Sequence, residues 1–177
     1  MALYIRVVLL LFITNSAYAQ LHFHPERSSM KITGTSSLHD WEMTVNEFNV
    51  TGVITHTQVQ NLKATIKAKS MESGKSIMDD KAYDAVQADD YPEIIFSAKT
   101  LQISGNSIVG KGNLVIGGES RVIDLDAEIV KNGAEMQLQG KVPLKMSDFD
   151  ITPPTAMFGT LKTGDEVVIH YDIFLTK

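Results

Sequence analysis

The stretch GTSSLHDWEM, residues 34–43, gathers the side chains of this sequence that are best suited to chemistry. Ser36 or Ser37, His39 and Asp40 are the residue types that form a nucleophilic triad. Successive side chains of a strand point to opposite faces, so His39 and Asp40 could not readily act as a base and its orienting acid. The chain also has no G-x-S-x-G motif. We therefore favour a corner between strands, in which Asp40 or Ser37 bonds local backbone and Trp41 anchors the next strand.

This interpretation predicts no catalytic residues and a protein that is not an enzyme.

Metal binding has two weak signals. His22 and His24 share one side of an extended segment, but a single H-x-H lacks the three or four ligands of a zinc site. Cleavage after Ala19 would leave the free amine of Gln20 with a histidine at position three, which can hold Cu(II). A flexible, solvated terminus is the alternative, and we expect no metal site and no cofactor.

The first nineteen residues have the pattern of a cleaved secretory signal. Arg6 precedes the apolar run Val7–Ile13, and Ala17-Tyr18-Ala19 matches the small-x-small sequence of a signal peptidase site. The run is far shorter than the roughly 20 apolar residues that span a bilayer as a helix. We interpret residues 1–19 as a signal peptide, with no transmembrane segment, and expect a periplasmic or secreted protein.

Residues 20–177 have the length of a single domain. Removal of Arg6 from the 16 lysines and arginines leaves 15 against 21 acids, a net charge of −6. This balance disfavours nucleic acid and anionic membrane surfaces as partners, since both require a concentrated basic face. The chain contains no cysteine, so no disulfide framework stabilises it. Its stability must come from a packed core and backbone pairing.

Apolar and polar residues alternate along most of the chain, which is typical of half-buried strands. The alternation predicts strands at 28–35, 41–50, 53–57, 62–69, 93–103, 108–116, 123–129, 134–144 and 166–175. Short turn sequences such as SGN at 104–106 and GGES at 117–120 separate several of them. Loops this short join neighbouring strands in antiparallel pairs.

One segment, residues 76–88, departs from the two-residue period. Met78, Ala82, Ala85 and Val86 fall at i, i+4, i+7 and i+8, which is one stripe of a helix. Ser76 suits the N-cap of that helix. The sequence therefore predicts an all-β fold of about eight antiparallel strands with one short inserted helix.

A meander of about eight strands forms either a sandwich or a barrel, and closure into a barrel removes the unpaired edges. The apolar face of the later strands includes Gly110, Gly112, Ala127 and Gly140, which supply little side-chain volume. These small residues are consistent with an apolar cavity inside the barrel. They are equally consistent with relief of crowding where a barrel strand coils sharply.

Four segments resemble the YceI-like family of exported lipid-binding domains. They are GTSSLHDW at 34–41, YPEIIFSA at 91–98, GNLVIGGESRVIDL at 112–125 and LKMSDFDITPPTAMFGTLKTGDEVVI at 144–169. The likeness covers essentially the whole of residues 20–177 and is greatest to a branch that carries SLHDW. It implies a lipocalin-like antiparallel β-barrel that holds a long-chain apolar ligand, such as a polyisoprenoid or a fatty-acid derivative. Ala85, Val86, Met146 and Asp79 depart from residues common in the family, which leaves the ligand's head group open.

The expected function is an exported binding protein whose partner is a long-chain apolar small molecule. The expected apolar lining is Met43, Phe48, Ile66, Phe96, Leu114, Met136, Leu138, Phe149, Met157 and Phe158. The loop at 148–159, stiffened by Pro153-Pro154, is expected at the cavity mouth. The alternative is a packed barrel that acts as a stress-related interaction module without a lipid ligand. The sequence leaves the oligomeric state open, with a homodimer among the options.

Overall fold

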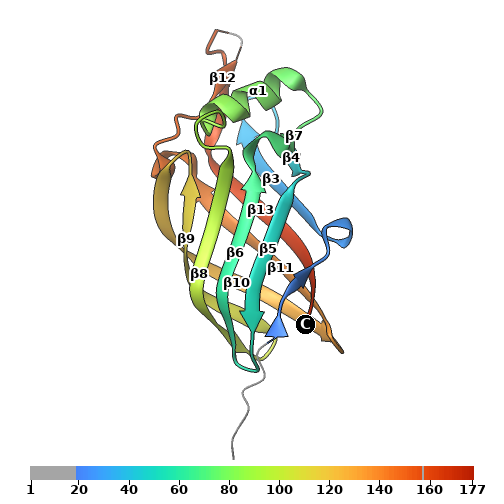
Figure 1. Cartoon of the computed structure of the whole chain (residues 1–177). Coiled ribbons are helices and arrows are strands. Elements are labelled where there is room, and N and C mark those ends of the chain that lie inside the picture. The colour runs from blue at the N-terminus through green and yellow to red at the C-terminus, as the bar shows by residue number, and fades with distance from the viewer. Residues whose placement is uncertain (1–18, 157) are drawn as a thin grey trace, which may run out of the picture.

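Most of the chain is extended, and its strands form an antiparallel sheet that curls into an elongated barrel (Figure 1). The computed structural model describes residues 19–156 and 158–177. The strands are β1 (Ala19–Gln20), β2 (His22–Phe23), β3 (Ser29–Ser36), β4 (Trp41–Val45), β5 (Phe48–Ile54), β6 (Gln58–Lys67), β7 (Met71–Glu72), β8 (Glu93–Ser104), β9 (Ser107–Ile116), β10 (Glu119–Asn132), β11 (Glu135–Lys145), β12 (Thr155–Ala156) and β13 (Leu161–Thr176). The helices are α1 (Ser76–Ala85) and the 3₁₀ segments η1 (Pro25–Arg27), η2 (Ala68–Ser70) and η3 (Met146–Phe149).

The strand order is β1-β5-β6-β8-β9-β10-β11-β13-β3-β4-β7, and every pairing is antiparallel. The all-β barrel with one short inserted helix that the sequence predicts is confirmed. Tight turns set the register of the long hairpins. Between β9 and β10, Gly117 and Gly118 have φ of 56° and 83°, so Ile116 pairs directly with Glu119. A two-residue turn with both φ values positive matches the twist of the strands that it joins.

The strand predicted at 53–57 is wrong. Val53 and Ile54 end β5, and the chain then turns before β6 begins at Gln58. The side chain of Thr55 explains the break, because its hydroxyl accepts hydrogen bonds from the amides of Thr57 and Gln58. A threonine hydroxyl that satisfies nearby amides in this way favours a turn over a continued strand.

Helix α1 is shorter than predicted and begins differently. Lys75 occupies the N-cap position without a side-chain cap, and the expected N-cap Ser76 is the first helical residue. Instead, the carboxylate of Asp79 accepts hydrogen bonds from the amide and the hydroxyl of Ser73 at 2.7 and 2.6 Å. An acid in the first helical turn interacts favourably with the helix dipole, and here it also ties the start of α1 to the preceding loop.

The N-terminal segment bridges the gap in the sheet between β5 and β13. β1 pairs with β5, and β2 pairs with the end of β13, with only Leu21 between them. Leu21 is buried, and its amide donates to the carbonyl of Gly52 at 2.9 Å. The ring of Phe23 packs on that of Phe48 at 5.3 Å between centroids. The segment therefore joins two strands that do not pair with each other.

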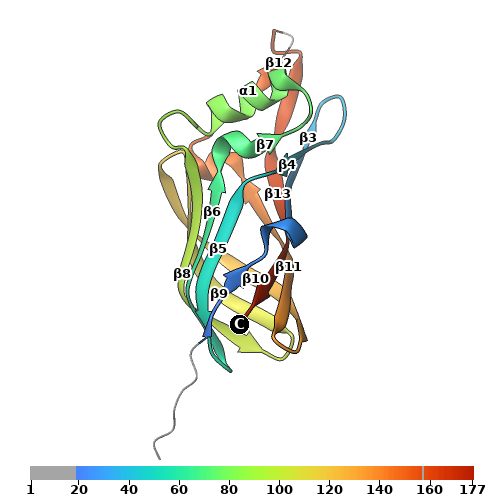
Figure 2. The ribbon, with the colours of Figure 1, turned by 45° about the vertical axis from the view of Figure 1, so that its right-hand side comes forward.

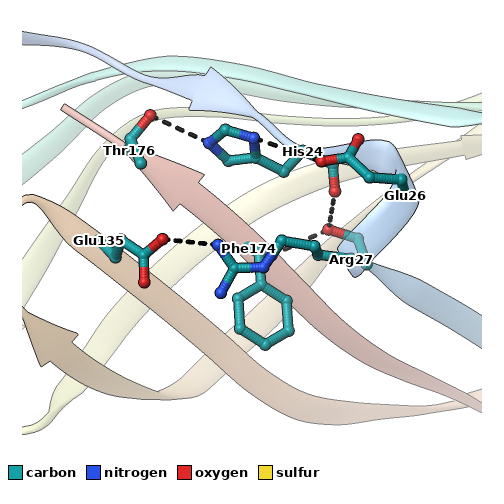
Figure 3. Close-up of polar contacts among 7 residues, drawn as sticks. His24, Glu26, Arg27, Glu135, Phe174 and Thr176 are labelled. Carbon is teal, nitrogen blue, oxygen red and sulfur yellow. Dashed lines mark hydrogen bonds and ion pairs between the residues drawn. The ribbon is translucent and has the colours of Figure 1, made fainter.

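Side chains just after β2 fasten this closure, as Figure 3 shows. His24 Nε2 lies 3.1 Å from the hydroxyl of Thr176. The guanidinium of Arg27 donates to Glu135 at 2.6 Å and lies 4.5 Å from the ring centroid of Phe174. The hydrogen bond from Arg27 also lowers the pKa of Glu135. These contacts link η1 to both β11 and β13.

The inward-facing glycines relieve crowding. A Cβ built at Gly112 would lie 2.2 Å from Cζ of Phe96, and one built at Gly140 would lie 2.2 Å from the hydroxyl of Tyr171. At Gly110 the nearest atom would be Cδ2 of Leu101, at 2.8 Å. The space that each glycine leaves is thus occupied by a large side chain from a neighbouring strand.

Gly112→Ala is expected to lower the free energy of unfolding by about 2 kcal/mol, since the new methyl group must displace the ring of Phe96. Urea denaturation measures the change. The control is Gly52→Ala, where a Cβ would meet its nearest atoms at an ordinary 3.4 Å, so a much smaller effect is expected. Adding Phe96→Leu to Gly112→Ala should recover part of the loss. Equal effects at the two glycines would contradict the crowding explanation.

Candidate ligand-binding cavity

A cavity of about 580 Å³ lies at the upper end of the barrel, beneath α1. Figure 2 shows α1, the β12–β13 hairpin and the β3–β4 turn gathered at this end. The lining comes from α1 and from residues that enclose the end of the barrel: Ile32, Ser36, His39, Trp41, Met43, Ile66, Met71, Lys75, Ser76, Ile77, Met78, Lys81, Ala82, Ala85, Val86, Ile94, Ile116, Leu144, Lys145, Met146, Phe149, Ile151, Pro154, Thr155, Ala156, Leu161, Thr163, Val167 and Ile169. Most of these side chains are apolar.

Helix α1 forms one wall of this cavity with the stripe that the sequence indicates. Met78, Ala82, Ala85 and Val86 all line the space. Two of the four are alanines, so the helix covers the barrel end without filling it. None of the residues of α1 is fully buried, as expected for a helix that packs over a cavity.

The segment after β11 forms the opposite wall. Phe149 and Ile151 are buried there, and Pro154 and Ala156 also line the cavity. The carboxylate of Asp165 fixes η3 to β13, because it accepts hydrogen bonds from the amide and the hydroxyl of Ser147. These bonds favour the charged form and lower the pKa of Asp165. The predicted mouth loop, residues 148–159, thus borders the cavity.

The GTSSLHDW segment is a turn at the rim, and its polar side chains bond backbone groups. The hydroxyl of Ser36 donates to the carbonyl of His39 and accepts from the amides of Leu38 and His39. His39 Nδ1 lies 2.7 Å from the carbonyl oxygen of Asp40. The corner is thus held by Ser36, where we expected Ser37 or Asp40. The hydroxyl of Ser37 instead accepts from the amide of Lys162.

A smaller cavity of about 100 Å³ lies deeper in the barrel. Ile66 and Ile169 line both cavities, so a chain that entered the upper cavity would point toward the lower one. The surface of the lower cavity is apolar, and Tyr171 is the one residue of its lining that carries a polar side-chain group, its hydroxyl. That hydroxyl is buried and has no hydrogen-bond partner among the described residues. Burial raises the pKa of Tyr171 to about 12, and the charge of Asp126 contributes in the same direction.

Tyr171→Phe is expected to stabilise the protein by about 1 kcal/mol at pH 8, because it removes an unpaired buried hydroxyl. The folded-state pKa lies above the usual unfolded value of about 10. The neutral hydroxyl's contribution to the free energy of unfolding is therefore fully present below pH 10. It is lost as the pH rises through 12. Tyr171→Phe should lose less stability over that interval, by about 2 kcal/mol, measured by urea denaturation at pH 8, 10 and 12. Parallel losses in the two proteins would contradict a buried, neutral tyrosine.

The structure places the predicted lining residues in several environments. Met43, Ile66 and Phe149 line the upper cavity. Phe96, Leu114 and Leu138 line the lower one, together with Ile66. Met157 lies outside the described residues.

Three other predicted residues line neither cavity. Phe48 packs against Phe23 at the seam of the barrel. Met136 is buried in the core. Phe158 is fully exposed in the turn between β12 and β13, where its φ is 56°.

The sequence reasoning missed most of the upper lining. Met71, Met146 and Val167 belong to it, as does the whole stripe of α1. One signal was available. The apolar face of an amphipathic helix inserted in a barrel must pack against the apolar interior of that barrel. Alanines in that face are too small to fill the gap between the helix and the strands. The remaining residues come from strand ends, where alternation does not reveal what lies above the barrel.

The N-terminal histidines lie in paired backbone. A copper chelate at Gln20-Leu21-His22 would need the Leu21 amide nitrogen, which donates to Gly52 in the closed barrel. The expected flexible terminus is wrong for residues 20–23, which pair with β5 and β13. In residues 19–156 and 158–177, no three His, Cys, Asp or Glu side chains gather to hold a metal. No helix in that part of the chain is long and apolar enough to cross a membrane.

Several solved structures share this fold. BcnA from Burkholderia cenocepacia is 19% identical, with a TM-score of 0.71 over 86% of this chain and 99% of its own. A polyisoprenoid-binding domain from Saccharophagus degradans, implicated in plant cell wall breakdown, is 13% identical, with a TM-score of 0.64 over 92% of this chain and 99% of its own. A YceI protein from Campylobacter jejuni is 19% identical, with a TM-score of 0.58 over 99% of this chain and 91% of its own.

No curated protein sequence matches the chain. The model of the YceI-like domain family, in contrast, matches residues 21–175. These bounds run from the residue that joins β1 to β2 almost to the end of β13, so they include the barrel, α1 and both cavities. The chain therefore belongs to the YceI-like domain family.

Proposed function

We propose that this protein is an exported binding protein that holds a long apolar chain in the upper cavity, without a catalytic step. The observation that carries the proposal is the cavity itself. Its volume of about 580 Å³ falls within the roughly 300–1,000 Å³ typical of small-molecule sites. Four methionines in its lining, Met43, Met71, Met78 and Met146, supply flexible and polarisable surface that adapts to different apolar ligands.

The comparisons support an apolar ligand of the isoprenoid type. The Saccharophagus degradans domain, which shares the fold, is described as polyisoprenoid-binding. A chain of this kind would enter beside α1 and extend toward Ile66 and Ile169, where the two cavities meet. A fatty-acid derivative is the other ligand class that suits an apolar space of this shape.

The alternative, a packed barrel that serves as an interaction module, suits the lower half of the molecule better than the upper half. Side chains pack the lower part of the barrel and leave only a cavity of about 100 Å³ there. The upper cavity is nearly six times larger. The binding function therefore rests on the upper end alone.

Mass spectrometry of organic extracts tests the proposed function. Protein purified gently, without detergent, should yield a long-chain apolar compound in near-equimolar amount. The matched control is the same extraction from an Ala82→Trp variant, in which the indole narrows the cavity and should reduce the amount of compound retained. An empty extract from the unmodified protein, together with no binding of added fatty acids or isoprenoids, would overturn the proposal.

Export is a separate prediction, based on the Ala17-Tyr18-Ala19 sequence. When the full chain is expressed in a Gram-negative host, the intact mass of periplasmic protein should correspond to Gln20, or its cyclised form, as the first residue. Cleavage there would leave Gln20 to pair with Val53 in β1. A periplasmic product that retains residues 7–13 would contradict this prediction.

A further inference from the structure

The charged side chains that line the upper cavity are all lysines. Lys75, Lys81 and Lys145 contribute to its lining, and His39 stands with them at the rim. No aspartate or glutamate of the described residues lines the cavity. Acids outnumber lysines and arginines in this chain by 21 to 16. A cavity lining with three lysines and no acid therefore contrasts with the composition of the whole chain.

These lysines come from opposite walls of the cavity. Lys75 and Lys81 flank the first turns of α1, whereas Lys145 ends β11, beside η3. None of the three forms an ion pair with a described residue, although six other basic side chains do. Lys81 is half-buried, and Lys75 and Lys145 are exposed. No ion pair among the described residues therefore occupies their ammonium groups. The charge of Lys145 also acts on Asp165, whose carboxylate is bonded to the amide and the hydroxyl of Ser147.

The nearest acids of α1 are directed elsewhere. Asp79 is bonded to the backbone and the hydroxyl of Ser73. Asp80 and Asp84 line a separate polar groove together with Lys69 and Asp89. The helix therefore has a basic and apolar side toward the cavity and an acidic side away from it. The amino-terminal end of α1, at Ser76 and Ile77, also lines the cavity and adds a partial positive charge.

We propose that the ligand is an anionic amphiphile, whose carboxylate or phosphate head is held at the mouth by Lys75, Lys81 and Lys145 while its apolar chain fills the cavity. This inference rests on the proposed function and specifies the ligand class. Lysine suits either head group, because its ammonium acts as a point charge without a fixed bidentate geometry. Its long aliphatic stem packs against apolar surface while the charged end stays in water, as a mouth position requires.

The test compares ligands that differ only in the head. Palmitate is paired with 1-hexadecanol, and geranylgeranyl phosphate with geranylgeraniol, and each displaces a neutral fluorescent apolar probe from the protein. The first pair tests a carboxylate and the second a phosphate. We expect the unmodified protein to prefer the anion of at least one pair on the order of tenfold, because three exposed charge contacts, each weak alone, act together on one head group. High salt should reduce this preference.

The deciding variant is Lys75→Gln/Lys81→Gln/Lys145→Gln. It should lose the preference for the anion and bind the alcohols as before. The matched control is Lys63→Gln/Lys99→Gln/Lys141→Gln, which removes the same charge from exposed positions of β6, β8 and β11. The control should retain the preference. Alcohols that bind as tightly as the anions, or equal losses in both variants, would overturn the anionic head while leaving the binding function intact. Failure of all four ligands to displace the probe would overturn both.

Discussion

Replacing Ala82 with tryptophan is expected to abolish retention of an apolar ligand while the barrel stays folded. Ala82 lies in the middle of the cavity face of α1, and its small side chain leaves the space below it open. An indole at this position would occupy part of the upper cavity, in the space between α1 and the strand ends. Accommodating a ligand as well would require overpacking, which costs roughly 1–3 kcal/mol. Affinity should fall at least about tenfold, since each 1.4 kcal/mol is a factor of ten.

The measurement is displacement of a fluorescent fatty-acid probe, with circular dichroism to verify the fold. The control is Asp84→Trp, which places the same indole on the same helix, in the polar groove away from the cavity. The control should bind as the unmodified protein does. If Ala82→Trp folds and binds the probe with undiminished affinity, the cavity beneath α1 is not the binding site.

Trp41→Ala is expected to destabilise the protein by about 3 kcal/mol, the lower end of the range for large aromatic truncations. The ring lies across Gly34 of the paired strand, where a Cβ would be only 2.3 Å from Cζ2 of Trp41. Its Nε1 donates to the carbonyl of Thr35 at 3.0 Å. The ring packs against the core and lines the upper cavity, so its loss removes packing and part of the cavity wall.

Urea denaturation compares this variant with His39→Ala, which changes the neighbouring rim side chain. His39 is exposed and bonds only the carbonyl oxygen of Asp40, so its loss should cost less than about 0.5 kcal/mol. This difference separates a structural corner from a catalytic one. Similar, small effects on stability in both variants would contradict the anchoring role of Trp41.

The sequence was sufficient to predict the architecture because alternation and helical periodicity report which side of an element is buried. The long hairpins from β8 to β11 and the apolar stripe of α1 were predictable for this reason. The break at Thr55 was not, because a hydroxyl that replaces strand pairing leaves no trace in the hydrophobic pattern. The closure by the N-terminal segment was not predicted either, because its strand pairs join residues 33 to 35 positions apart on one side and 152 to 154 on the other.

The candidate site was predicted in part. The alternation of apolar and polar residues identified inward-facing side chains such as Ile66 and Leu114. It does not show which part of the barrel interior is packed and which part holds a cavity. That depends on pairs such as Phe96 with Gly112, where one strand fills the space left by another. The grouping of three lysines at the cavity mouth could not be predicted from the sequence for a related reason. Lys145 is 64 positions beyond Lys81, and it joins Lys75 and Lys81 only because α1 and the end of β11 border the same cavity.

The central claim is that an apolar chain occupies the cavity beneath α1, and photolabelling tests it most directly. A fatty acid with a diazirine at its terminal carbon would be bound to the purified protein, irradiated, and the labelled peptides sequenced. The account predicts labels on residues that line the cavity from different strands, such as Met43, Ile66 and Leu144, and their loss in Ala82→Trp. Labels confined to the exposed outer-wall residues Val122 and Val130, unchanged in Ala82→Trp, would contradict it.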